Sequence, residues 1–212
     1  IIIRYLKKDM IGLPWSGEMA DPRRRSVFEL LRKCDWHQAH STHVANMALK
    51  IFDTLEDELE LEKADRELLE YASYLHDIGY YISHSKHHKH ALYIIRHSTL
   101  KGFREEEIEI IANVARYHRR STPKKRHGEY WKLAPEVRRR IRKLSGILRV
   151  ADGLDRSHYQ NVKKLELEVK ENELLFKIEV QADPQLEIWG AQRKAHLLRA
   201  LSGKKISFEV VN

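Results

Sequence analysis

The sequence has only one cysteine, Cys34, among 212 residues. A single thiol cannot form a disulfide within the chain, which agrees with a reducing, cytoplasmic setting. No apolar run approaches the ~20 residues of a membrane-spanning helix, and the three isoleucines at 1–3 are too short for the core of a signal peptide. We therefore expect a cytoplasmic protein without a membrane segment. Glycine-rich phosphate loops are also absent, which argues against ATP binding.

Positive charge is in excess, since 39 lysines and arginines face 31 acidic residues and give a net charge of +8. Such an excess attracts anions, although a basic run is also explained by a solvated helix face. A functional role is better supported where the basic residues bracket His118. Recognised nucleic-acid-binding motifs and aromatic stacking patterns are absent, so we expect no nucleic-acid partner. The basic clusters are 23–25, 116–120, 124–126 and 138–143.

Apolar spacing predicts a mainly α fold with a small α+β part at its C-terminal end. A period of 3.6 residues predicts helices at about 22–33, 37–57, 63–77, 87–98, 104–118 and 135–151. Beyond Asn161 the period changes to two, which predicts a hairpin, a helix at 191–201 and a final strand at 206–210. We accordingly divide the chain into a connecting helix and linker at 1–20, a helical domain at 21–160 and a subdomain at 161–212. We expect no catalytic group in that subdomain.

Four of the predicted helices have a polar residue in line with their apolar face. Residues three or four apart lie on the same face of a helix. We therefore expect these polar side chains to point into a common interior. The apolar neighbours at this spacing are Val44 for His40, Ala72 for His76, Ala115 for His118 and Leu148 for Asp152.

These inward residues form a candidate metal site. Buried imidazole and carboxylate groups need a partner to offset their desolvation, and one cation could serve all of them. Asp77 follows His76 directly, so nitrogen and oxygen ligands are adjacent, a combination that suits Mn, Fe, Ni or Zn better than Mg. His87 could supply a further ligand, whereas we expect His84, His88 and His90 to face solvent or substrate. The alternative is that each residue is satisfied separately within the core.

The order of His40, His76-Asp77 and Asp152 resembles the HD phosphohydrolase superfamily. Longer stretches resemble the C-terminal portion of exopolyphosphatase/guanosine pentaphosphate phosphohydrolase proteins. They lie at 1–6, 40–45, 75–79, 82–90, 114–119 and 148–158. The resemblance implies an HD-type helical domain with one or two divalent metals, a homodimer, and actin-like phosphatase domains upstream in the full-length protein. Some members of this family lose metal ligands in this domain, whereas this sequence keeps them.

The resemblance also implies hydrolysis of a phosphate-containing small molecule or polyphosphate. Asp77, together with a metal-bound water, is the predicted catalytic group, because a divalent ion can activate water and polarise a phosphoryl oxygen. Basic side chains near the ligands are predicted to bind the substrate phosphate, with arginine giving bidentate contacts. These are Lys89, Arg119, Arg120 and Arg156. The alternative function is a non-catalytic module for polyphosphate binding, dimerisation or regulation of the missing domains.

Overall fold

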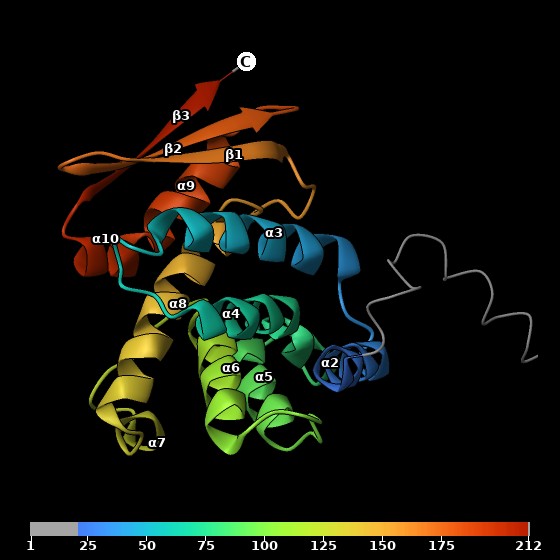
Figure 1. Ribbon diagram of the computed structural model, residues 1–212. Coiled ribbons are helices and arrows are strands. Elements are labelled where there is room, and N and C mark those ends of the chain that lie inside the picture. Colours follow the sequence, from blue (N-terminus) through green and yellow to red (C-terminus); the bar gives the residue numbers. More distant parts are fainter. Residues whose placement is uncertain (1–20, 212) are drawn as a thin grey trace, which may run out of the picture.

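The computed structural model describes residues 21–211 (Figure 1). The predicted connecting helix and linker at 1–20 lie outside these described residues. The helical elements are α2 (Pro22–Lys33), α3 (Gln38–Leu55), α4 (Lys63–Leu75), η2 (Ile78–Tyr81), α5 (His87–Arg96), α6 (Glu105–Tyr117), α7 (Gly128–Trp131), α8 (Pro135–Gly153), α9 (Gln185–Lys194) and α10 (His196–Ser202). The strands are β1 (Val162–Val169), β2 (Glu173–Val180) and β3 (Lys205–Val211).

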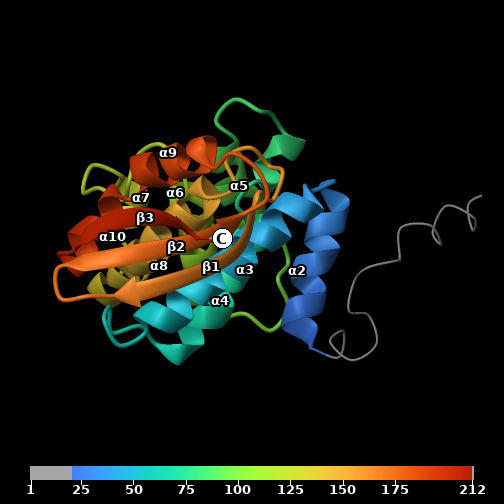
Figure 2. The same ribbon diagram turned by 90° about the horizontal axis from the view of Figure 1, so that it is seen from above.

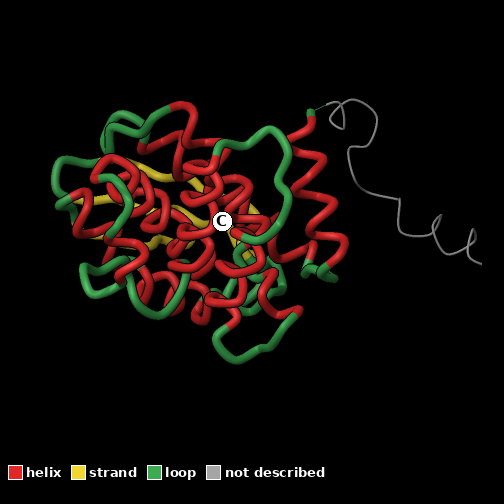
Figure 3. Tube along the Cα trace, turned by 90° about the horizontal axis from the view of Figure 1, so that it is seen from below, coloured by secondary structure: helices red, strands yellow, loops and turns green. Residues whose placement is uncertain are grey.

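The molecule has a layer of helices below a small sheet. Figure 3 shows the helices from below, with the strands behind them. In the helical layer α3 packs on α4 and α8, while α6 packs on α4, α5 and α8. The apolar stripes of these helices meet in one core, where Ile51, Leu68 and Leu144 are fully buried. Burial of each such side chain contributes roughly 1.5–3 kcal/mol.

The sheet has the strand order β1-β2-β3. β1 and β2 form the predicted antiparallel hairpin, whereas β3 pairs with β2 in parallel. A parallel neighbour needs a crossover connection, and α9 and α10 supply it. Figure 2 shows β1 on the α3 side of the sheet and β3 on the α9 side, in agreement with the contacts between these elements.

The predicted mainly α fold with a small C-terminal α+β part is confirmed. The predicted start of α2 is also confirmed, since the Asp21 side chain accepts hydrogen bonds from the backbone N–H groups of Arg23 and Arg24. One detail was wrong. The single helix predicted at 191–201 begins six residues earlier, at Gln185, and is divided near Ala195 into α9 and α10. Within residues 21–211 no helix is both long and apolar enough to cross a bilayer.

Candidate metal centre

The six predicted metal ligands come together at the ends of helices. His40 lies in the first turn of α3, His87 begins α5, and Asp152 is the penultimate residue of α8. His76 caps the C-terminus of α4, and Asp77 precedes η2 directly. The sixth ligand, at the C-cap of α6, is His118. All six side chains are buried.

Gly79 allows α5 to approach the His76-Asp77 pair closely. A Cβ atom at this position would lie 2.0 Å from the backbone oxygen of His87. Atoms cannot approach so closely, so any larger residue would push α5 away. The glycine two residues after Asp77 thus brings His87 next to that carboxylate, with His87 Nε2 3.1 Å from Asp77 Oδ1.

A first group of ligand atoms consists of His40 Nε2, His76 Nε2, Asp77 Oδ2 and Asp152 Oδ1. The two nitrogens lie 3.2 Å apart. Asp77 Oδ2 is 3.7 Å from His40 Nε2 and 3.5 Å from His76 Nε2. Asp152 Oδ1 is 3.8 Å and 3.9 Å from the same nitrogens. Ligand atoms ~2.1 Å from one ion lie about 3.0 to 3.4 Å apart at octahedral or tetrahedral angles, so this group fits a single ion after small movements.

A second group uses the other oxygen of the same aspartate. Asp77 Oδ1 lies 3.1 Å from His87 Nε2 and 3.5 Å from His118 Nε2. The two imidazole nitrogens are 3.4 Å apart. Asp77 therefore presents one oxygen to each group. A carboxylate in this position can bridge two ions of the kind found ~3.5–4 Å apart in two-metal hydrolases.

The Nδ1 atoms of the four imidazoles have partners of the kind that orient metal-binding histidines. The Nδ1–H groups of His76, His87 and His118 donate to the backbone oxygens of Ser73, His84 and Ala115 at 2.7, 3.2 and 2.6 Å. His40 Nδ1 lies 2.8 Å from Asp155 Oδ2. A neutral imidazole that donates through Nδ1 has a lone pair on Nε2, and such partners orient metal-binding histidines.

The positions of the four Nε2 atoms are a further feature that fits bound cations. They face one another in two pairs, His40 with His76 and His87 with His118. Two Nε2 atoms at this distance need a proton or a metal cation between them, and a divalent cation can serve both pairs; Arg119 Nη1 also lies 3.1 Å from His87 Nε2. The donor set therefore fits divalent metal ions better than it fits a core of separately satisfied residues.

The charge states of the centre also suit metal binding. Burial lowers the pKa of His76, and it lowers that of His118 well below the usual value. Burial alone would raise the pKa of Asp77, but the surrounding imidazoles outweigh it and hold this pKa well below its usual range. Burial alone would also raise the pKa of Asp152, but the positive charge of Lys194 is the main effect that outweighs it and lowers this pKa below its usual value. The carboxylates are thus ionised, as ligands must be, and His76 and His118 are neutral.

The pKa of His40 is raised, whereas those of His76 and His118 are lowered. Burial would lower the pKa of His40, but the hydrogen bond to Asp155 and the charges of Asp152 and Asp77 raise it. Asp155 is itself fully buried and also accepts a hydrogen bond from the backbone N–H of Gln160 at 2.8 Å. It therefore fixes the orientation of the His40 ring. Asp155 is not among the predicted site residues, although it follows Asp152 by three residues, a spacing that would continue the same face if the helix extended past Gly153.

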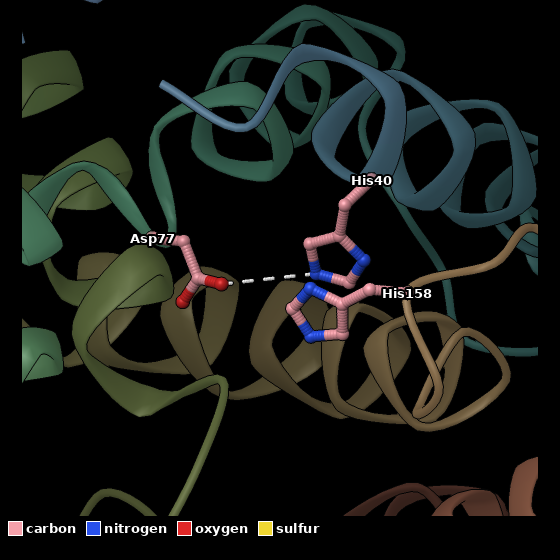
Figure 4. Close-up of side chains that lie close together, drawn as sticks. All are labelled: His40, Asp77 and His158. Atoms are coloured by element: carbon pink, nitrogen blue, oxygen red, sulfur yellow. Dashed lines mark ion pairs between the residues drawn. The ribbon is translucent and has the colours of Figure 1, made fainter. Parts of the chain in front are cut away.

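His158 is a second residue that the sequence analysis missed. Its ring stacks on that of His40, with 3.7 Å between the centroids, as Figure 4 shows. His40, Asp77 and His158 together form a further group with the spacing of metal ligands. A signal was available, because His158 ends the stretch 148–158 that resembles the phosphohydrolase family. His158 has no apolar stripe of its own, however, so periodicity could not place it.

A basic cavity of about 390 Å³ opens onto the ligands. Asp77, His87, His118 and Asp152 lie in its wall. Of the predicted phosphate-binding residues, Arg119, Arg120 and Arg156 line the cavity, whereas Lys89 is exposed on α5 and is not in its wall. Further cations that the sequence analysis did not select complete the basic lining: Arg149, Arg193 and Lys194.

Lys194 and Arg193 reach the cavity because α9 packs directly on the end of α8. A Cβ atom on Gly153 would lie 2.6 Å from Ala191 Cα, and one on Gly190 would lie 2.6 Å from the Gly153 oxygen. Two glycines thus allow backbone contact between the helices. The amine of Lys194 then forms an ion pair with Asp152 Oδ2. The C-terminal segment, in which we expected no catalytic group, therefore contributes to the site.

Fold and site together define a helical domain with a buried histidine and aspartate centre below a basic cavity. Residues 23–192 match a family model described as "Ppx/GppA phosphatase, domain III". The chain belongs to this family.

Three curated proteins named guanosine-5'-triphosphate,3'-diphosphate pyrophosphatase are similar to part of the chain. The protein from Pseudoalteromonas translucida is 27% identical over 101 residues, which are 47% of this chain and 20% of that protein. The protein from Photobacterium profundum is 30% identical over 99 residues, with the same coverage. The protein from Aeromonas hydrophila is 29% identical over 102 residues, 48% of this chain and 21% of that protein. The match thus spans about a fifth of each relative's length.

Proposed function

We propose that this domain is a divalent-metal-dependent phosphohydrolase in which Asp77 would bridge two ions. One observation carries the proposal: the two oxygens of Asp77 face separate groups of imidazole nitrogens, at 3.5–3.7 Å and at 3.1–3.5 Å. His40, His76 and Asp152 would hold the first ion, and His87 and His118 the second. Bound ions of this kind activate water and neutralise charge on a phosphoryl group.

The residues around the ligands support a phosphate-bearing substrate. Arg119, Arg120 and Arg156 line the cavity and can form charge-assisted hydrogen bonds to phosphate oxygens. Lys194 holds Asp152 Oδ2 and so directs Oδ1 toward the histidines. The family and the names of the relatives support the same substrate class, which includes nucleotides, other phosphate esters and polyphosphate.

The metal content tests this proposal. We expect one or two tightly bound ions of Mn, Fe, Ni or Zn per chain, or Mg, because the donors are mixed nitrogen and oxygen atoms. Elemental analysis of untagged protein, purified without added metal, measures this directly. Reconstituted protein should hydrolyse at least one member of a panel of nucleotides and phosphate esters. Less than a tenth of an ion per chain, with no recovery after reconstitution, would contradict the metal centre.

A second candidate is an accessory module that binds polyphosphate, dimerises or regulates upstream actin-like catalytic domains. The observation that favours it is the basic lining of the cavity, where Arg119, Arg120, Arg149, Arg156, Arg193 and Lys194 gather. The small share of each relative that the chain matches is also consistent with a part that serves a larger protein.

Replacement of Arg119 and Arg120 by alanine distinguishes the two functions. For an enzyme, we expect small-ester turnover to fall by roughly a hundredfold at unchanged metal content, because phosphate charge is no longer neutralised. For a polyanion-binding module, turnover would be absent in wild type, and the same change would weaken polyphosphate binding and flatten its salt dependence. Ester hydrolysis and polyphosphate binding at several salt concentrations are the two measurements. Lys132→Ala, at an exposed lysine that pairs with Glu129 and lies outside the cavity wall, is the control.

A further inference from the structure

A second basic cavity lies away from the metal centre. Its volume is about 450 Å³, and it lies between the loop that follows α6, the short helix α7 and the first half of α8. Arg142 of its wall precedes Asp152 by ten residues on α8, which corresponds to about 15 Å along the helix. The two cavities share none of their lining residues. This second cavity is therefore a separate site.

The charge of the second cavity is largely uncompensated. Lys124, Lys125, Arg138, Arg139 and Arg142 line it, and no acidic residue is in its wall. Arg139 pairs with Glu136 at 3.3 Å on the surface. Within residues 21–211, Lys124, Lys125 and Arg142 have no carboxylate oxygen within 4.0 Å. Like charges gathered around a hollow repel one another, and an anion bound there would remove that repulsion.

An aromatic ring lies among these cations. The guanidinium of Arg138 lies 3.8 Å from the centroid of the Trp131 ring, and Lys125 Nζ lies 5.7 Å from it. Arg138 Nη1 also donates to the Trp131 backbone oxygen at 2.9 Å. These contacts hold the ring in place, yet 43% of Trp131 remains exposed. A partly exposed indole beside several cations is an arrangement that binds nucleic-acid components, because bases stack on the ring while phosphates contact the cations.

We infer that this second cavity binds a nucleoside polyphosphate, with the base on Trp131 and the phosphates at Lys124, Lys125 and Arg142. The volume lies in the range of about 300–1,000 Å³ that small-molecule pockets occupy. An inorganic phosphate chain would make no use of the indole. The absence of a glycine-rich loop argued against ATP binding through backbone amides, but here side chains supply the contacts. The inference is independent of hydrolysis at the metal centre.

Calorimetric titration tests the site. The probes are the non-hydrolysable β,γ-imido analogue of GTP, inorganic tripolyphosphate and guanosine, each with excess EDTA so that metal-dependent binding at the other cavity is removed. We expect the analogue to bind more tightly than either other probe. Lys124→Glu and Arg142→Glu should each weaken its binding by roughly tenfold or more, because charge-assisted contacts are lost. Lys132→Glu is the matched control, since this exposed lysine is adjacent but outside the cavity wall.

Trp131→Ala separates a nucleotide from an inorganic polyanion. Loss of the indole on which the base stacks should weaken binding of the analogue by roughly tenfold and change tripolyphosphate binding less than about twofold. The nucleotide assignment is overturned if Trp131→Ala weakens both ligands equally or neither. The whole inference is overturned if the analogue does not bind, or if the Lys124→Glu and Arg142→Glu variants bind it with the same affinity as wild type. All these substitutions lie outside the fully buried core, and circular dichroism verifies that each variant is folded.

Discussion

Replacement of Asp77 by alanine is expected to lower kcat/KM for phosphate-ester hydrolysis by roughly a thousandfold or more. Asp77 presents one carboxylate oxygen to each group of imidazoles, so its loss would disturb both predicted metal positions at once. Several kcal/mol of charge stabilisation would disappear, and about 4 kcal/mol corresponds to roughly a thousandfold in rate. Steady-state kinetics with reconstituted protein, together with its metal content, measure the effect.

Asp53→Ala is the matched control for the Asp77 variant. Asp53 is an exposed aspartate that pairs with Arg66 on the surface, with 2.6 Å between Asp53 Oδ1 and Arg66 Nε. An exposed pair of this kind contributes little to stability. Activity should therefore remain near that of wild type. If the Asp77 variant kept more than a tenth of wild-type activity and its full metal content, the bridging role of Asp77 would be wrong.

Removal of metal is expected to lower the melting temperature by about 10 °C. An ion that binds only the folded state, at a free concentration about a thousand times its Kd, stabilises that state by about 4 kcal/mol. For a chain of this length, 1 kcal/mol shifts the melting temperature by about 2–4 °C. Thermal unfolding by circular dichroism, before and after EDTA, gives the shift.

The His76→Ala variant is the control for the EDTA experiment. This variant lacks one ligand of the first group, so EDTA should shift its melting temperature less than that of wild type. Adding back Mn²⁺ should restore the wild-type value. A wild-type melting temperature that stays the same with and without EDTA would show that the centre contributes no metal-linked stability, and would favour the accessory-module function.

Much of the fold could be predicted because helical periodicity identifies both the helices and their buried faces. The stripe of Val44 and Ile51 placed His40 in the interior, and that of Leu144 and Leu148 placed Asp152 there. The predicted roles of these residues as metal ligands remain predictions. The short elements η2 and α7 were missed, since four residues are too few to show a period.

The remaining parts of the site depend on contacts that a linear pattern does not contain. His158 follows the end of α8 in a left-handed conformation, with φ of 61°, and stacks on a ring more than a hundred residues earlier in the chain. Lys194 belongs to a helix whose position depends on two glycines in different elements. Lys89 is close to His87 in sequence but lies outside the cavity wall, and its role in phosphate binding stays a prediction.

The contact between Gly153 and Gly190 has a consequence for how this protein can be divided. The predicted boundary between helical domain and subdomain falls at residue 160, but the cavity wall takes Trp189, Arg193 and Lys194 from beyond it. A fragment ending at residue 160 would retain all six predicted ligands and lose the wall that covers them. Under the proposed hydrolytic function, exchange of C-terminal segments between homologues should therefore transfer substrate preference along with the segment, while the predicted metal ligands stay with the recipient.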